Sequence, residues 1–321
     1  MQHASFLGQG RIRIDSSNGP EPVAGEVVLR VSACALCGSD LRPLRQGWPT
    51  TPGHEIVGVV DSPGHRLTGR RCLVYIPVHC GRCECCRAGD THMCETMTQL
   101  MGWQRPGGYA EAVAVPEQCL IPVPDDIPTE LAPLLLDTIG TAGHGVRLAR
   151  RIVAGGPALV MGAGPIGLGA IMVLRRLGFG TIHVVEPQAH RREFAASFGA
   201  VPVEAAALPQ RYPVVVEATG KDAARQAALE AVKPRGAVIQ LGESDAWAIS
   251  ETRRIRLKDF YYIRSFYFPL NEFDDNVAML RADLAEYRRF VDARVPLAGL
   301  ETLFAEFAAG RRIKPQLSLG T

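Results

Sequence analysis

The chain has 321 residues, of which 47% are hydrophobic and 21% are charged, and its formal net charge is +2. This length is enough for two domains of an ordinary globular protein. The small net charge gives no reason to expect nucleic-acid or membrane-surface partners, and no apolar run of about 18 residues predicts a membrane-spanning helix. The first residues do not predict a signal peptide.

Nine cysteines are present, and five of them fall between Cys80 and Cys94. In a reducing cytoplasm such clustering is typical of metal binding, whereas a secreted disulfide framework would spread its cysteines more evenly. We therefore expect a cytoplasmic protein with free or metal-bound thiols.

The first 125 residues are predicted to be mainly β, with glycines and prolines between short strands. The strands are expected at residues 27–31, 56–60, 72–76 and 110–115. A helix is expected to begin at residues 128–132, and a second helical segment, interrupted by glycines, covers residues 138–151. Residues 154–157, which contain two glycines and a proline, are predicted to mark the boundary before a region of alternating strands and helices.

From residue 158 onward, apolar strands alternate with helices. Such strands predict a parallel sheet that is covered by helices on both faces. The strands are expected at residues 158–161, 182–186, 214–217, 237–241 and 261–267, and the helices at residues 165–177, 189–198 and 222–232. The tail is predicted as helices at residues 271–291 and 297–310, followed by a strand at residues 315–319. The fold class is α/β.

A glycine-rich motif links the first of these strands to its helix. Gly162 would make the tight turn, Gly164 would let a diphosphate approach the backbone, and Gly167 would let helix and strand pack closely. Glu186 ends the next strand, where a carboxylate binds a ribose 2′-hydroxyl and repels a 2′-phosphate, so NAD is favoured over NADP. Arg191 weakens that preference. The predicted cofactor-binding residues are Thr141, Gly162, Gly164, Pro165, Ile166, Gly167, Glu186, Arg191 and Gly242.

Four cysteines have the spacing of a closed tetrahedral zinc site. They follow the pattern C-x2-C-x2-C-x7-C, and four thiolates leave no coordination position for water. This zinc would be structural, and its ligands are Cys80, Cys83, Cys86 and Cys94. We interpret Cys85 as a spectator, and we expect His79 and His92 to be exposed loop residues.

A second zinc site is predicted around Cys37 and His54. A catalytic zinc needs three protein ligands and one open position. Glu55 and Asp137 are the candidates for the third ligand, and the residues leave this choice open. Asp40 is a candidate for orienting the His54 ring.

These motifs and their order along the chain resemble those of the zinc-containing medium-chain dehydrogenase/reductase family, which includes the alcohol and polyol dehydrogenases. The motifs are Cys37-Gly38-Ser39-Asp40, Gly53-His54-Glu55, the segment from Cys80 to Cys94, Gly107-Gly108-Tyr109-Ala110-Glu111, and Gly162-Ala163-Gly164-Pro165-Ile166-Gly167. The resemblance implies a GroES-like β-rich catalytic domain joined to a doubly wound Rossmann domain.

The domain bounds expected from this resemblance are residues 1–148 for the catalytic domain, with its structural-zinc lobe at residues 77–100. The Rossmann domain would cover residues 149–288, and residues 289–321 would return to the catalytic domain. Asp137 stands where the sorbitol and threonine dehydrogenases carry an acid, so the chain is most similar to that branch. The resemblance also implies a homodimer or homotetramer.

The expected function is hydride transfer between NAD and a secondary alcohol, a polyol or a sugar-like hydroxyl, with a ketone as the product. The catalytic set is Ser39, Cys37, His54, Glu55 and Asp137, in which Ser39 accepts the hydroxyl proton. Arg42 stands where other members carry the histidine that ends the proton relay, and arginine cannot accept a proton. Two alternatives stay open, namely an NADP-linked carbonyl reductase and a non-catalytic protein that binds zinc and NAD.

Overall fold

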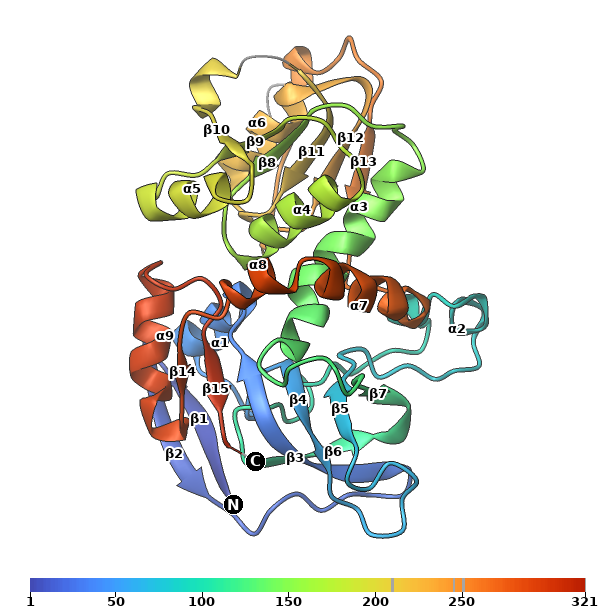
Figure 1. Cartoon of the computed structure of the whole chain (residues 1–321), viewed down its shortest axis with the longest axis vertical. Helices are drawn as coiled ribbons and strands as arrows, with labels where there is room; N and C mark the ends of the chain where they lie inside the picture. The colour runs from blue at the N-terminus through green and yellow to red at the C-terminus, as the bar shows by residue number, and fades with distance from the viewer. Residues whose placement is uncertain (209–210, 245, 250–251, 321) are drawn as a thin grey trace. The chain divides into compact units, whose positions relative to one another are not determined.

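The computed structural model of the chain describes residues 1–208, 211–244, 246–249 and 252–320 (Figure 1). Its described part forms two compact units. The first unit comprises Met1–Leu136, Pro269–Asn271 and Asp283–Thr321, and the second comprises Asp137–Phe268 and Glu272–Ala282. One unit is rich in antiparallel strands and the other has a parallel sheet, so the predicted α/β class is confirmed.

A seven-stranded sheet forms the core of the first unit. Its strand order is β14-β15-β3-β4-β5-β7, with β6 paired to β3, and all pairs except β14–β15 are antiparallel. All four strands predicted from the first 125 residues are present. The bounds are β3 Glu26–Ala35, β4 Glu55–Val60, β5 Arg71–Val74, β6 Ala112–Pro116, β7 Leu120–Pro122, β14 Arg294–Val295 and β15 Gln316–Ser318.

The pairing of β3 with β4 explains why Cys37 and His54 meet. In this antiparallel register, Ala35 at the end of β3 lies opposite Glu55 at the start of β4. Cys37 therefore follows one strand and His54 precedes the other at the same edge of the sheet. The 16 residues between them, 38–53, include the 3₁₀ turn Gly38–Asp40 and the helix α1, Leu41–Gln46.

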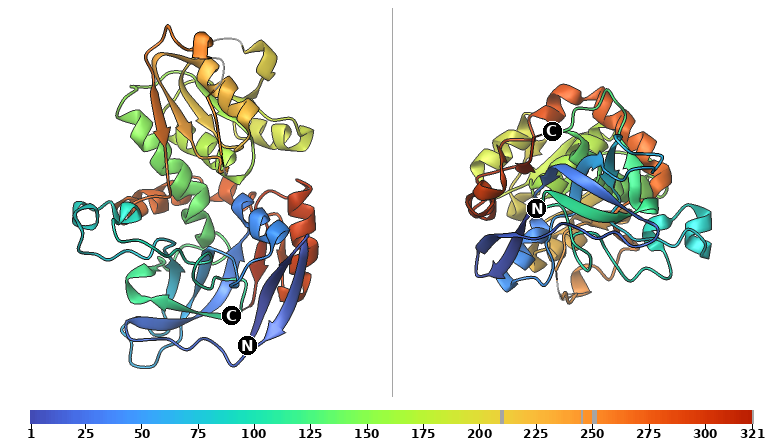
Figure 2. Two further views of the ribbon diagram at one scale, coloured as in Figure 1. Left: turned by 180° about the vertical axis from the view of Figure 1, so that it is seen from behind. Right: turned by 90° about the horizontal axis from the view of Figure 1, so that it is seen from below.

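A two-stranded hairpin lies outside that sheet. Strand β1, Gln2–Gly8, pairs with β2, Arg11–Ser16, across a turn in which Gln9 and Gly10 both have positive φ. Positive φ at both central residues gives the twist that a tight hairpin needs. Helix α9, Leu300–Ala308, lies beside this hairpin in both views (Figures 1 and 2), and Phe304 contacts Phe6 edge to face.

Six parallel strands form the sheet of the second unit, in the order β10-β9-β8-β11-β12-β13. Helix α4 covers one face and α6 the other (Figures 1 and 2), as the alternating pattern predicted. The bounds are β8 Ala158–Met161, α4 Pro165–Arg176, β9 Ile182–Val185, α5 Ala189–Ala196, β10 Val201–Pro202, β11 Tyr212–Glu217, α6 Asp222–Ala231, β12 Val232–Gln240 and β13 Tyr261–Arg264.

The predicted helices outside these sheets are more divided than expected. The segment from residue 128 contains a 3₁₀ turn, Ala132–Leu135, a π turn, Asp137–Thr141, and the helix α3, Ala142–Arg150. The single helix predicted at residues 271–291 is two helices, α7 Phe273–Ala282 and α8 Leu284–Arg288. Asp283 breaks the run because its φ of −126° and ψ of 36° are not helical.

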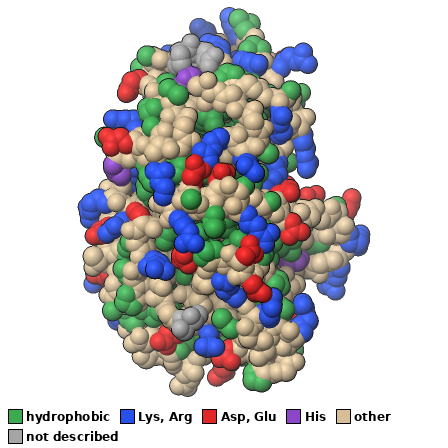
Figure 3. Space-filling view, in the orientation of Figure 1, with side chains coloured by type: hydrophobic (Ala, Val, Ile, Leu, Met, Phe, Trp, Pro, Cys, Tyr) green, Lys and Arg blue, Asp and Glu red, His purple; other side chains and the backbone are tan. Residues whose placement is uncertain are grey.

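Charged side chains of both signs lie interspersed on the face drawn in Figure 3, which agrees with the small net charge. Among the described residues, no helix combines the length and the apolar character that crossing a membrane requires.

Candidate functional site

The first candidate metal group lies at the edge where β3 ends and β4 begins. Cys37, His54, Glu55 and Asp137 each offer one ligand atom, all of these atoms lie within 4.8 Å of one another, and all four residues are buried. Asp137 follows Leu136, the last residue of this segment of the first unit. One thiol, one imidazole and carboxylates are a donor set that zinc accepts.

Asp40 positions the imidazole of His54. Its Oδ1 lies 3.2 Å from Nδ1 of His54, and its Oδ2 accepts hydrogen bonds from the Cys37 N–H at 2.9 Å and from the Tyr109 hydroxyl at 2.6 Å. Asp40 and His54 are both almost completely buried. With Nδ1 next to a carboxylate oxygen, Nε2 is the nitrogen that is left for a metal ion, as expected if Asp40 orients the ring.

Burial also affects the pKa of the tyrosine in this network. Desolvation, and then the charge of Asp40, raise the pKa of Tyr109 well above its ordinary value. Tyr109 is therefore a neutral hydrogen-bond donor that holds Asp40 in place.

Gly53, immediately before His54, has a φ of +99°, and an added Cβ would lie 2.9 Å from Cys34 Sγ and from the Tyr109 ring. The Gly-His-Glu motif therefore requires glycine for both conformation and space.

Lys314 is a site residue that the sequence did not reveal. Its Nζ donates a hydrogen bond to Oε1 of Glu55, and both side chains are fully buried. Lys314 belongs to the C-terminal segment of the first unit, 259 residues after Glu55. One oxygen of Glu55 is thus directed at an ammonium group, while Oδ1 of Asp137 accepts a hydrogen bond from the Thr141 hydroxyl at 2.9 Å.

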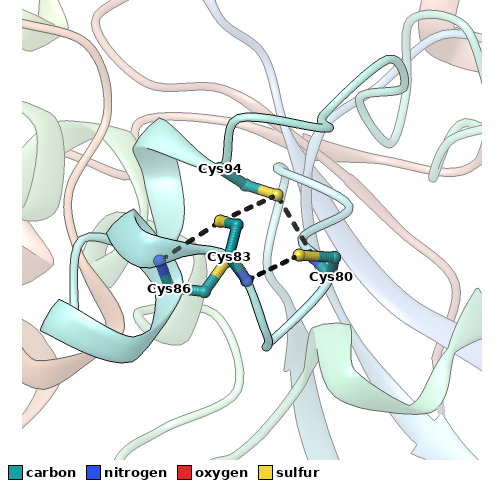
Figure 4. A group of neighbouring side chains, drawn as sticks. All are labelled: Cys80, Cys83, Cys86 and Cys94. Atoms are coloured by element: carbon teal, nitrogen blue, oxygen red, sulfur yellow. Dashed lines mark hydrogen bonds between the residues drawn. The ribbon is translucent and has the colours of Figure 1, made fainter.

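The second candidate metal group is the set of four cysteines in Figure 4. Cys80, Cys83, Cys86 and Cys94 have ligand atoms within 4.8 Å of one another. Cys83 caps the helix α2, Glu84–Ala88, and Cys94 follows a 3₁₀ turn, Thr91–Met93. Cys83 and Cys86 are three residues apart at the helix start, so both can face one point. This arrangement fits the closed tetrahedral site that the spacing predicted.

Backbone N–H groups donate hydrogen bonds to these sulfurs. Cys80 Sγ accepts from Arg82 at 3.4 Å and from Cys83 at 3.3 Å, and Cys83 Sγ accepts from Cys86 at 3.4 Å. The N–H of Arg82, then the Thr96 hydroxyl, lower the pKa of the Cys80 thiol to about 5, whereas burial raises the pKa of Cys86 to about 12. The lobe therefore favours a thiolate at Cys80 before any metal binds.

Two histidines near this lobe differ from the prediction. His79 and His92 are 6% and 4% exposed, so the expectation that they are exposed loop residues was wrong. The Tyr75 ring packs edge to face against His79, and a nearby hydroxyl of Thr91 bonds to the Tyr75 hydroxyl. Tyr75 follows β5 directly, so these contacts hold His79 and Thr91, the neighbour of His92, close to the sheet. Cys85, expected to be a spectator, directs its thiol at Glu95, 3.7 Å away.

The glycine-rich loop of the second unit has the geometry that each of its glycines was expected to provide. Gly162 has a φ of +94°, and a Cβ on Gly167 would lie 1.9 Å from the Gly162 oxygen. A Cβ on Gly164 would meet no atom within 4 Å, so the space beside it is open. Pro165 begins helix α4 and Ile166 follows it. The N–H groups at the start of this 12-residue helix can bind a diphosphate.

The carboxylate of Glu186 accepts hydrogen bonds from backbone N–H groups, one of them in the same loop. Its Oε2 accepts a hydrogen bond from the Ala163 N–H at 2.8 Å, its Oε1 accepts one from Gln188 at 3.0 Å, and the residue is 7% exposed. Arg191 is half-buried on helix α5, a few residues further on. Two residues after the end of β12, the Gly242 N–H donates a hydrogen bond to the backbone carbonyl oxygen of Glu217 at 3.0 Å.

Two tryptophans belong to the first unit, and His144 belongs to the second. Trp103 stacks on the His54 ring at 5.5 Å, and Trp48 meets Trp103 edge to face at 5.6 Å. His144 lies in the second unit, where its Nδ1 is 3.0 Å from the carboxylate of Glu272.

Two protein-family models match this chain, one mainly in the first unit and one in the second. Residues 23–125 match the alcohol dehydrogenase GroES-like domain, and residues 147–265 match the glucose dehydrogenase C-terminus. Among solved structures, the alcohol dehydrogenase from Thermus sp. ATN1 is 26% identical and has a TM-score of 0.88, with 99% of this chain and 100% of that chain covered.

Several curated relatives carry substrate names. An L-threonine 3-dehydrogenase from an Anaeromyxobacter species is 31% identical, with 94% of each chain covered. The L-threonine 3-dehydrogenase of Rhizobium johnstonii is 33% identical over 62% of this chain and 61% of its own length. The 2-dehydro-3-deoxy-L-galactonate 5-dehydrogenase of Pseudoalteromonas atlantica is 27% identical over 94% of each chain. The chain belongs to the zinc-containing medium-chain dehydrogenase/reductase family of oxidoreductases.

Proposed function

We propose that this protein oxidises a secondary alcohol, a polyol or a sugar-derived hydroxyl reversibly to a ketone, with NAD as the hydride acceptor. The observation that supports this most directly is the buried group of Cys37, His54, Glu55 and Asp137 with Asp40 behind the imidazole. A zinc ion bound there supplies Lewis acidity, which lowers the pKa of a hydroxyl group.

Cys37, His54 and Asp137 are the ligands that we propose. Glu55 shares a fully buried ion pair with Lys314, and the ammonium group competes with a cation for the same carboxylate. Asp137 instead accepts a hydrogen bond from a neutral donor, the Thr141 hydroxyl, at 2.9 Å, and it offers a carboxylate oxygen to the same group of ligand atoms. Glu55 then acts as a charge beside the site, held by Lys314.

Ser39 accepts the proton of the substrate hydroxyl in this proposal. It lies two residues after Cys37 in the 3₁₀ turn Gly38–Asp40 and is partly exposed, whereas Asp40 of the same turn is buried. Because Arg42 stays protonated, the proton leaves Ser39 through the cofactor ribose or through water.

The second unit would bind the cofactor at the glycine-rich loop. We favour NAD because the carboxylate of Glu186 lies at the end of β9, against the N–H of Ala163 in the loop, where it would repel a 2′-phosphate. The cofactor-binding roles of Thr141, Arg191 and Gly242 stay predictions. The domain bounds predicted at residues 148 and 288 also stay predictions.

The substrate class rests on two kinds of support. The acid at position 137 is the residue type of the sorbitol and threonine dehydrogenases, and the relatives named above act, by their names, on threonine and on a deoxygalactonate. The test is to follow absorbance at 340 nm with zinc-loaded protein, NAD, and a panel of polyols, hydroxy amino acids and sugar acids. Turnover supports the proposal, and full zinc and NADH binding without turnover of any alcohol would favour a non-catalytic binder.

We also propose a cytoplasmic homodimer or homotetramer. In the described structure none of the nine cysteines forms a disulfide, which suits a reducing compartment. Strand β13 is at the end of the parallel sheet, where a second copy can pair with it, and its Tyr261 is 53% exposed. Light scattering of the purified protein tests the oligomeric state.

A further inference from the structure

The parallel sheet of the second unit has two ends with different surroundings. Strands β11, β12 and β13 run in the same direction, so their first residues lie at one end of the sheet and their last residues at the other. The glycine-rich loop follows β8, and Gly242 follows β12, so the predicted cofactor residues lie where strands finish. A ligand at the end where strands begin would therefore be separate from the cofactor.

Three cations near the start of these strands surround the last turn of helix α6. Arg211, directly before β11, donates a hydrogen bond to the backbone oxygen of Glu230. Lys258 donates to the same oxygen at 2.9 Å and to the Val232 oxygen at 2.8 Å, and Nη1 of Arg254 lies 3.2 Å from the Glu230 carboxylate. Cations at a helix C-terminus bind its last carbonyl groups and stabilise its dipole. These three residues therefore have a role in the fold.

Four further cations at the same end have no such role. They are Lys233, Arg235, Arg253 and Arg256. All four are exposed, and within the described part of the chain their side chains form no hydrogen bond or ion pair. The N–H of Arg235 donates a hydrogen bond to the Asp259 oxygen, which joins the start of β12 to the segment before β13. We call the surface formed by these four and the three cations around α6 the basic end of the sheet.

The charge of the basic end is one-sided. Among the described residues of the same segments, 229–236 and 252–260, the only carboxylates are those of Glu230 and Asp259, and Glu230 already pairs with Arg254. Lys and Arg side chains stand at the top of the view in Figure 3, where Figure 1 draws the starts of these strands. The formal charge of the whole chain is only +2, because acids elsewhere offset this concentration. Such a local excess of positive charge attracts polyanions.

Leu257 indicates which kind of polyanion fits. Its side chain is 88% exposed, and its neighbours in the sequence are Arg256 and Lys258. Ile255, two residues earlier, packs against the core cluster that includes Leu229, so the segment already has an apolar residue that anchors it to the fold. An exposed leucine gains nothing from the polar backbone of a nucleic acid, but it can enter the boundary between lipid headgroups and acyl chains. Cations around such a side chain favour an anionic bilayer.

We propose that the basic end of the sheet docks on an anionic lipid surface, with Leu257 at the level of the headgroups and the exposed cations close to the lipid phosphates. Association of this kind is peripheral and reversible, because one apolar side chain and a few charges are far weaker than a membrane-spanning helix. The surface uses neither the candidate metal groups nor the glycine-rich loop. The proposal is therefore independent of the proposed dehydrogenase function.

Sedimentation of the full chain with lipid vesicles tests the proposal. The wild type should bind vesicles of phosphatidylcholine that contain about 30% phosphatidylglycerol, and it should bind pure phosphatidylcholine at least about 10-fold more weakly. Binding should be lost at about 1 M NaCl, where charges are screened within about 3 Å. Lys233→Gln/Arg253→Gln/Arg256→Gln should weaken binding to the anionic vesicles about 100-fold, and Leu257→Ser about 10-fold. Arg235 is kept because its φ is +61°.

The control removes the same number of charges from another part of the protein. Arg11, Arg45 and Arg66 are exposed arginines of the first unit, and Arg11→Gln/Arg45→Gln/Arg66→Gln should bind the anionic vesicles as the wild type does. Arg253→Lys/Arg256→Lys keeps both charges and should also keep the binding. The thermal midpoint and the NADH dissociation constant should stay those of the wild type in every variant, since none of the changed side chains belongs to a proposed site.

Several results would overturn the proposal. A wild-type protein that does not bind the anionic vesicles would refute it directly, and an equal loss of binding in the control would show a response to net charge alone. Equally tight binding to a DNA duplex, with Leu257→Ser unchanged on vesicles and on DNA, would assign the surface to nucleic acid or to polyanions in general. A change of oligomeric state in Leu257→Ser, measured by light scattering without lipid, would show that a second copy of the chain covers this leucine.

Discussion

At the scale of single residues, the ion pair between Lys314 and Glu55 has the clearest energetic consequence. Both side chains are fully buried, so neither charge can be stabilised by water if its partner is removed. Removal of one partner from a buried pair leaves an uncompensated charge in a medium of low polarity, which costs about 3–5 kcal/mol. The pair is also the reason why we propose Asp137, and not Glu55, as the third metal ligand.

Lys314→Met tests that consequence. We expect its free energy of unfolding, measured with urea, to fall by about 3–5 kcal/mol. The double variant Lys314→Met/Glu55→Gln should regain much of the loss because neither member of the pair is then left as a buried charge without the other. Arg13→Met, which breaks the exposed pair with Asp15, is the control and should change stability far less. A single variant as stable as the wild type would contradict the role assigned to the pair.

The sequence predicted some of these residues and not others for a physical reason. Cys37 and His54 stand in short motifs whose residue types are metal ligands, and Asp40 lies within one of those motifs. Lys314 stands in a basic segment, Arg311-Arg312-Ile313-Lys314, where nothing distinguishes it from a solvated lysine. Only the fold brings it to Glu55, because β15 pairs with β3 beside β4.

At the scale of elements, the glycine-rich loop separates packing from ligand binding. A Cβ at position 167 would lie 1.9 Å from the Gly162 oxygen, so helix α4 must move away from its strand. A Cβ at position 164 meets no protein atom, but it would occupy the space that a diphosphate needs. The two glycines therefore have different functions.

Gly167→Ala and Gly164→Ala should show this difference. We expect Gly167→Ala to lower both the thermal midpoint and the NADH affinity, and Gly164→Ala to weaken NADH binding while the thermal midpoint of the cofactor-free protein stays near that of the wild type. NADH fluorescence titration and calorimetry measure the two quantities. Equal effects of both variants on stability would show that the space beside Gly164 is not reserved for a ligand.

The cysteine lobe is a second element with its own testable chemistry. In the metal-free protein, the Cys80 thiol, with a pKa of about 5, is ionised above that pH, whereas Cys86, with a pKa of about 12, stays protonated at neutral pH. Since the thiolate is the nucleophile, iodoacetamide should modify Cys80 before Cys86 at pH 6–7. Mass spectrometry of the tryptic peptides measures the order. Faster modification of Cys86 would contradict the hydrogen-bond pattern of the lobe.

The elements that sequence patterns identified best are those with strong local signals. The parallel strands and helices from residue 158 onward agree with the structure to within a few residues, because apolar strands and amphipathic helices differ in period. The hairpin β1–β2 was missed, since Arg11–Ser16 alternates charged and apolar residues on an open surface. The helix over residues 271–291 was predicted as one because its break, at Asp283, depends on a single backbone conformation.

At the scale of the whole molecule, the chain order explains why the first unit is built from both ends of the sequence. Residues 1–136 supply the sheet, Cys37 and His54, and residues 283–321 supply β15 and Lys314. The parallel-sheet unit lies between these segments in the sequence. The sheet of the first unit is therefore complete only when the C-terminal segment is paired with β3.

The two metal groups should hold two zinc ions of different lability. The group at Cys37 and His54 has three proposed ligands and an open position, whereas the four-cysteine group is closed. We expect two zinc ions per chain by metal analysis. His54→Gln and Cys94→Ser should each retain about one ion, and the double variant none, because the two groups share no residue. With 1,10-phenanthroline, one zinc should leave rapidly together with dehydrogenase activity, and the second should leave slowly with loss of thermal stability. The opposing outcome is a wild-type protein that holds only one zinc, which His54→Gln keeps and Cys94→Ser loses. That result would leave the four-cysteine site intact and rule out the proposed zinc-dependent chemistry at His54.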